Sequence, residues 1–165
     1  MKETTYGDFI RAAFISSLIG GAVLAFTMVI PAASGVRIWP GTQIAAYPFI
    51  GHQVYETGFA MVPMVLGTLI HFAISFLWAL GFVFSVRNRT RVQTMLLSVP
   101  FGLVVWLVMH QGVLRLINAQ DLLSRINPLL GVLQHLGFAV AIGATLVLLQ
   151  PQNWRFRRTR RALAA

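Results

Sequence analysis

The chain has 165 residues, a formal net charge of +9 and no cysteine. Hydrophobic residues make up 57% of it and charged residues only 10%, whereas an ordinary soluble domain carries about 25% charged residues. This composition excludes a soluble globular protein and predicts an all-α, polytopic membrane protein. Because there is no cysteine, disulfides, thiolate metal sites, iron–sulfur clusters and cysteine nucleophiles are excluded as well.

Four apolar runs are each long enough to cross a bilayer core, which takes about 20 helical residues. They cover about residues 9–30, 62–86, 94–117 and 129–149. The short links 87–91 and 118–127 should make the second, third and fourth spans consecutive antiparallel neighbours. The sequence therefore predicts a four-helix bundle in one integral membrane domain, residues 1–165, with a basic tail at residues 150–165.

Small residues form a stripe along the first run, because Ala13, Ser17 and Gly21 lie at four-residue spacing. Such residues allow close helix packing in lipid, so we expect this face to dock against a neighbour, with a membrane-protein partner or a second copy as candidates. A cleaved signal peptide is the alternative interpretation, since Lys2 precedes the run and small residues follow it at 32–35. The run is longer than the roughly 7–15 apolar residues of a signal peptide, which favours a spanning helix.

The segment 36–60 combines helix-breaking prolines and glycines with aromatic residues that suit a membrane–water interface. We expect an extracytoplasmic loop that lies on the bilayer between the first two spans. A short helix over about residues 49–57 would place His52 and Glu56 on one face, most simply as a solvated ion pair.

Prolines mark the later spans. Pro63 lies in the first turn of the second span and Pro128 just before the fourth, where a missing N–H costs little. Pro100 lies one to two turns inside the third span, so we expect it to bend that helix or to free a backbone carbonyl.

Basic residues gather on one side of the predicted bundle. That side collects Lys2, Arg11, Arg87, Arg89, Arg91, Arg155, Arg157, Arg158, Arg160 and Arg161. The other side has only Arg37, Arg115 and Arg125, so the positive-inside rule places both termini in the cytoplasm.

The tail interleaves arginine with Trp154 and Phe156, as RNA-binding segments also do. Its basic residues are Arg155, Arg157, Arg158, Arg160 and Arg161. Because the tail directly follows a spanning helix, we expect these arginines to contact anionic lipid headgroups, at about 1 kcal/mol each, and not nucleic acid.

Three histidines fall inside the predicted spans, one each on the second, third and fourth: His71, His110 and His135. Counted from the outer end of each span, all three lie about 9–14 Å below the outer boundary. Ionisable side chains at such depth are costly and suggest function by default. Gly67 and Gly131 lie one turn before two of them and are expected to leave room for something wider than a side chain.

Three interpretations of this histidine layer stay open, beside a substrate or proton path. A pair of the histidines could ligate the iron of haem b across the bundle. All three could instead bind a transition-metal ion, with His52 or Glu56 completing the site, because neutral imidazole suits Zn, Cu or Fe. The third interpretation is structural: the histidines hydrogen-bond to one another, to the adjacent Gln111 and Gln134, or to backbone, and so lock the bundle.

No phosphate loop, dinucleotide fingerprint, HExxH or GxSxG motif is present, and the predicted spans contain no carboxylate. We therefore expect a non-catalytic protein whose histidine layer binds haem or a metal ion. The alternatives are a structural or assembly subunit of a larger membrane complex, and a metal-dependent enzyme that acts on a lipid or quinone.

Short motifs around the histidines resemble a known family. They are the stretches 67–75 (GTLIHFAIS), 102–110 (GLVVWLVMH) and 135–138 (HLGF). The chain is similar there, over about residues 60–150, to the YagU-like bacterial inner-membrane proteins, which also place a histidine on three successive helices. The resemblance implies an inner-membrane location and an association with acid tolerance. It carries over the three histidines but not His52 or Glu56, and the outer loop is shorter here than in the family.

Overall fold

The structure is a computed structural model that describes residues 6–27, 41–56, 60–125 and 127–149. All regular secondary structure in these ranges is helical, and four helices are long and apolar enough to cross a membrane. They are α1 (Tyr6–Thr27), α5 (Met61–Val86), the composite helix Arg91–Leu116 and α9 (Pro128–Leu149), with 22, 26, 26 and 22 residues. The prediction of an all-α protein with four membrane spans is confirmed.

Side-chain caps define where two of these helices begin. At the start of α6 (Arg91–Trp106), the Gln93 N–H donates to Thr90 Oγ1 at 3.2 Å and the Thr90 N–H donates to Gln93 Oε1 at 3.1 Å. At the start of α9, the Leu129 N–H donates to Asn127 Oδ1 at 3.0 Å. The capped start of α6 leaves only residues 87–90 as its link to α5, so these two helices run antiparallel.

The third span is not one regular helix. The α-helix α6 continues through Pro100 and is followed by a π-helix, η2 (Leu107–Val113), and a short α-helix, α7 (Leu114–Leu116). A six-residue helix, α8 (Gln120–Arg125), then leads to α9. His110 therefore lies in a π-helical segment, which is rare and often found at functional sites.

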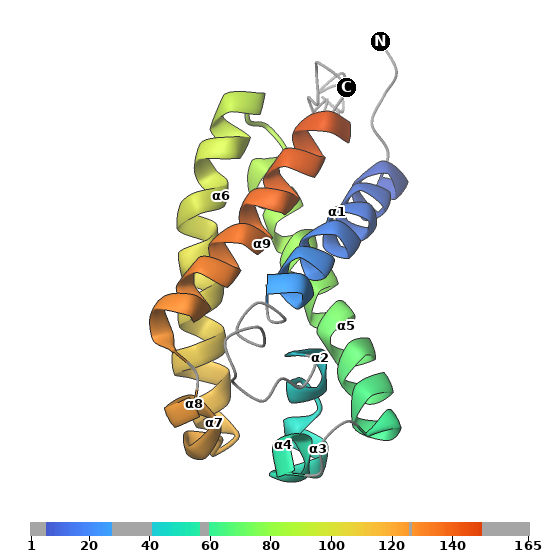
Figure 1. Cartoon of the computed structure of the whole chain (residues 1–165). Coiled ribbons are helices and arrows are strands. Elements are labelled where there is room, and N and C mark those ends of the chain that lie inside the picture. The colour runs from blue at the N-terminus through green and yellow to red at the C-terminus, as the bar shows by residue number, and fades with distance from the viewer. Residues whose placement is uncertain (1–5, 28–40, 57–59, 126, 150–165) are drawn as a thin grey trace, which may run out of the picture.

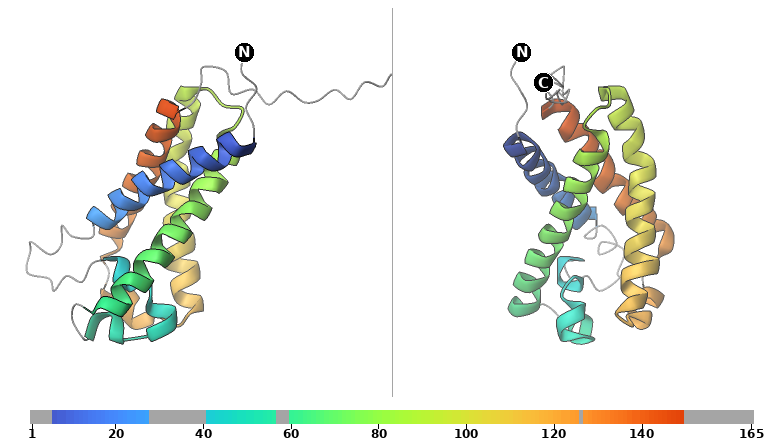
Figure 2. Two further views of the ribbon diagram at one scale, coloured as in Figure 1. Left: turned by 90° about the vertical axis from the view of Figure 1, so that its right-hand side faces the viewer. Right: turned by 180° about the vertical axis from the view of Figure 1, so that it is seen from behind.

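The spans are arranged around α1 and α9. α1 packs against both α5 and α9, and α9 also packs along α6 (Figure 1). α5 and α6 meet near their link and diverge toward the opposite end of the molecule (Figure 2). The third and fourth spans are thus close neighbours, as expected from their connection, whereas the second and third are neighbours only near their link.

The two ends of the molecule differ. The start of α1, the end of α9 and the link 87–90 lie together at what we call the link end (Figure 1). Three short helices, α2 (Gly41–Ile44), α3 (Tyr47–Ile50) and α4 (Gln53–Glu56), lie with α7 and α8 at the opposite, loop end.

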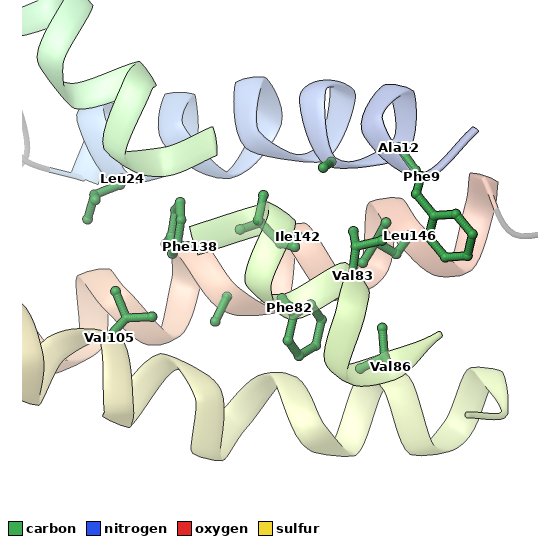
Figure 3. Packing of buried hydrophobic residues seen from close by; sticks show 13 residues of the cluster. Phe9, Ala12, Leu24, Phe82, Val83, Val86, Val105, Phe138, Ile142 and Leu146 are labelled. Atoms are coloured by element: carbon green, nitrogen blue, oxygen red, sulfur yellow. The ribbon is translucent and has the colours of Figure 1, made fainter. Parts of the chain in front are cut away.

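The main core lies where α1, α5 and α9 meet, and Val105 of α6 extends it (Figure 3). Its largest buried side chains include Phe82, Phe138, Ile142 and Leu146, which are 0–1% exposed. Large side chains on the opposite faces of the spans, such as Leu69 and Leu96, are exposed, as expected for helices that face lipid.

The small residues of α1 are buried within the chain. A Cβ on Gly20 would lie 2.7 Å from Ile142 Cγ1 of α9, and a Cβ on Gly21 would lie 2.9 Å from the Phe72 ring of α5. Ala13 and Ser17, the rest of the predicted stripe, are also buried. The stripe therefore allows α1 to approach its two neighbours in the same chain closely.

The segment α2–α4 differs from the expected loop. It does not lie flat across the helix ends, because α2 packs along α5 and a Cβ on Gly67 would overlap the Thr42 carbonyl oxygen. Gly67 lies six residues after the first residue of α5, about 9 Å along the helix from its N-terminal end. Ala46, Tyr47 and Val54 form a second buried cluster with Ala119, on the connection between α7 and α8. The α2–α4 segment thus fills the space between the diverging helices (Figure 2).

The predicted short helix over residues 49–57 is wrong in detail. Gly51 adopts a φ of +58°, which favours glycine, and separates α3 from α4. His52 follows this break and is exposed, with its ring 6.0 Å from that of Tyr47. Glu56 ends α4, but its side chain is outside the described part of the structure.

Candidate functional site

The three span histidines lie on α5, η2 and α9, about 9–15 Å from the loop ends of these spans. The rings of His110 and His135 are in edge contact, with their centroids 5.1 Å apart and their planes at 81°. His71 contacts Gly21 of α1 and Phe72 of its own helix. The structure therefore brings His110 and His135 into direct contact.

His135 is buried and oriented by its own helix. Its Nδ1–H donates to the carbonyl oxygen of Gly131, one turn earlier, at 2.8 Å. A neutral imidazole that donates from Nδ1 has a lone pair on Nε2. Nε2 is then the nitrogen of this ring that can bind a further group.

His71 joins α5 to α1. Its Nε2–H donates to the carbonyl oxygen of Gly21 at 2.9 Å, and its ring stands edge-on to Phe72 at a centroid distance of 5.2 Å. By the same argument, the lone pair of neutral His71 lies on Nδ1. This hydrogen bond agrees with the structural role considered for the histidines, since it fixes two spans to each other.

His110 is the least satisfied of the three. Its Nδ1 is buried and makes no well-aligned hydrogen bond within the described residues, although the imidazole interacts with the backbone of Trp106. The indole Nε1 of Trp106 is also buried without a hydrogen-bond partner among those residues. The two rings are 5.8 Å apart and tilted by 31°. Buried polar atoms of this kind call for a physical explanation, such as a bound water or ligand.

Gly131 allows these rings to approach α9. A Cβ at this position would lie 2.9 Å from His110 Nε2 and 3.2 Å from Trp106 Nε1. Gly67 and Gly131 were expected to leave room for a ligand. Instead, the Thr42 backbone occupies the space beside Gly67, and the two rings occupy the space beside Gly131.

The other predicted site residues are placed differently. Gln134 donates from Nε2 to the Thr27 carbonyl oxygen at 3.1 Å and so ties α9 to α1, while Gln111 is exposed. His52 lies beside Tyr47 in the α2–α4 segment. The tail arginines at 155, 157, 158, 160 and 161 lie outside the described residues. Among the residues that are described, no group of three or more His, Asp or Glu side chains is arranged to hold a metal ion.

No protein-family model, curated protein or solved structure matches this chain. The resemblance to YagU-like proteins thus stays a prediction from three short motifs. What the chain does has to follow from the chemistry of its histidine layer.

Proposed function

We propose that this chain is a small, non-catalytic bacterial inner-membrane protein that binds a transition-metal ion through His110 and His135. The observation that carries the proposal is the edge contact of these two rings at 5.1 Å inside a membrane-spanning region. Metal ions bind imidazole nitrogen at about 2.0–2.1 Å, so one ion can be shared by two rings at about this separation.

The hydrogen bonds of His135 and His71 support the proposal. Metal-ligating histidines usually donate their second ring N–H to a backbone carbonyl or carboxylate, which orients the ring. His135 donates to Gly131 in this way and His71 to Gly21. Two ligands leave at least two positions of a tetrahedral ion open, and His71 is the candidate to fill one of them.

The geometry supports a metal ion better than haem. The haem macrocycle would have to lie between its two axial imidazoles. In the structure α6 packs directly on α9, since a Cβ on Gly102 would lie 2.9 Å from the His135 carbonyl oxygen. Haem b would therefore require these helices to separate, whereas a single ion would not.

A structural role is the second candidate. Two tertiary hydrogen bonds favour it, from His71 to Gly21 and from Gln134 to Thr27, because both attach α1 to the rest of the bundle. Interhelical hydrogen bonds in membranes contribute about 0.6 kcal/mol on average. On this interpretation the chain serves as a rigid subunit of a larger membrane complex.

Metal titration separates the two candidates. Detergent-purified protein is stripped with chelator and titrated with Zn²⁺, Cu²⁺ or Fe²⁺, with bound metal measured by elemental analysis. We expect one ion per chain, and His110→Ala and His135→Ala to weaken binding by at least about tenfold. His52→Ala, which removes an exposed histidine beside Tyr47, is the matched control. A wild-type chain that retains no metal, or variants that bind as tightly as the wild type, would favour the structural role.

We also propose that both termini and the link between α5 and α6 face the cytoplasm, and this orientation can be tested directly. Arg87 and Arg89 lie on the link between α5 and α6, at the same end as the start of α1 and the end of α9. Because the chain has no cysteine, single cysteines can be labelled without background. In intact cells with a permeabilised outer membrane, we expect an impermeant maleimide to label Pro48→Cys but not Asn88→Cys. The opposite pattern would reverse the topology.

A further inference from the structure

At the junction where the end of α6 and η2 meet α9, two buried ring nitrogens make no well-aligned hydrogen bond within the described residues. They are Trp106 Nε1, which can only donate, and His110 Nδ1. Both rings lie against Gly131, where the indole nitrogen and the imidazole would each be within 3.3 Å of a Cβ. An unpaired buried N–H destabilises a protein, so a hydrogen-bond partner for the indole would stabilise this one.

The position of this junction limits what that partner can be. Leu103, Leu107 and Leu133 flank it and are 43–55% exposed, on faces expected to contact lipid. Trp106 and His110 are themselves partly exposed, although Trp106 Nε1 and His110 Nδ1 are covered. A molecule would reach the junction from the bilayer, where a charged ligand is strongly disfavoured and a neutral one is not.

We infer that the junction of Trp106, His110 and Gly131 binds a neutral, membrane-soluble molecule through a carbonyl oxygen of the quinone type. The indole N–H of Trp106 donates to that oxygen. If His110 binds a metal ion through Nε2, its Nδ1 carries a proton, which the Trp106 backbone and the bound carbonyl oxygen can share. The inference depends on Trp106 and Gly131 and holds whether or not the histidine pair binds metal.

The indole N–H signals provide an atom-specific test. The full chain, labelled with ¹⁵N-tryptophan in lipid nanodiscs, is titrated with a short-tailed benzoquinone. Trp106→Phe keeps an aromatic ring, removes the N–H donor together with part of the bicyclic ring, and assigns the Trp106 signal by its loss. We expect the benzoquinone to shift the Trp106 signal. Trp78 packs against Phe101 on α5 and α6, and its signal should not move.

Binding affinity gives the second readout. We expect Trp106→Phe to weaken benzoquinone binding by about three- to tenfold, the effect of one net hydrogen bond. An alkylbenzene of the same length, which has no carbonyl, should not shift the Trp106 signal. Metal binding by Trp106→Phe serves as the fold control and reports separately on the histidine pair.

Three results would overturn the inference. The first is an unmoved Trp106 signal at saturating benzoquinone, and the second is equal affinity in Trp106→Phe. The third is an equal shift with the alkylbenzene, which would mean simple partitioning into lipid. If the Trp106 N–H contacts only water, its signal will not move with benzoquinone, which is the first of these results.

Discussion

At the scale of single residues, adjacent glycines in α1 serve different neighbours. Gly20 lies against Ile142 and Phe138 of α9, whereas Gly21 lies against Phe72 and Ser75 of α5. Neither position has room for a methyl group without displacement of its neighbours. One turn of α1 thus determines how closely it approaches two other spans.

Gly20→Ala should therefore destabilise the protein. The new Cβ would lie 2.7 Å from Ile142 Cγ1 and 3.1 Å from the Phe138 carbonyl oxygen, so the α1–α9 contact has to widen. We expect a loss of about 1–3 kcal/mol in the free energy of unfolding, measured by SDS titration in mixed micelles. Gly81→Ala is the control, because a Cβ there meets nothing within 4 Å. Equal stability of Gly20→Ala and wild type would contradict the close α1–α9 crossing.

The sequence predicted the histidine layer better than it predicted its surroundings. Helix rise and span boundaries are enough to estimate the depth of a residue, so the three histidines could be assigned to one level. What fills the space beside Gly67 and Gly131 depends on segments far away in the sequence. Trp106 shares a helix face with His110 by spacing, but only the structure shows that its N–H is buried and unpaired within the described residues.

At the scale of elements, the four spans could be predicted because length and apolarity are sufficient to define them. The π-helix η2 could not, since one extra residue per turn over a single segment leaves an apolar sequence pattern unchanged. The start of α6 was expected at about residue 94 and occurs at Arg91, where the capping box of Thr90 and Gln93 adds about one turn before the apolar run.

Thr90→Ala tests this cap. Loss of the side-chain acceptor leaves the Gln93 N–H without its partner at the start of α6. We expect the unfolding free energy to fall by about 0.5–2 kcal/mol in the same SDS titration. Ser85→Ala is the matched control, because that exposed hydroxyl only donates to carbonyls of its own helix. A similar effect in both variants would show that the cap does not stabilise α6.

At the scale of the whole molecule, chain connectivity is a poor guide to contacts. The short link 87–91 predicted that α5 and α6 would be antiparallel neighbours. They do meet near this link but then diverge, and the more extensive packing is that of α9 with α6 and with α1. The divergence matters because it creates the space that α2–α4 occupies at the loop end. Such an arrangement depends on packing between distant segments, which the hydrophobic pattern of one chain does not encode.

Gly67→Val tests whether α2 is held against α5. Its side chain would overlap the Thr42 carbonyl, so α2 has to move away. We expect faster hydrogen exchange in residues 41–56, with little change at the link end of the molecule. Gly112→Ala is the control, because a Cβ there meets nothing within 4 Å. Unchanged exchange in Gly67→Val would mean that the α2–α4 segment does not depend on this contact.

The position of α2–α4 also determines when, during synthesis, the parts of the protein can pack together. Residues 41–56 leave the ribosome before α5, α7 and α8, yet their buried cluster includes Ala119 and packs against Leu66 and Leu114. The first span likewise packs on the last. Neither the core nor the loop end can therefore close until most of the chain has been inserted, and early spans must wait in the bilayer or at the insertion machinery for their late partners.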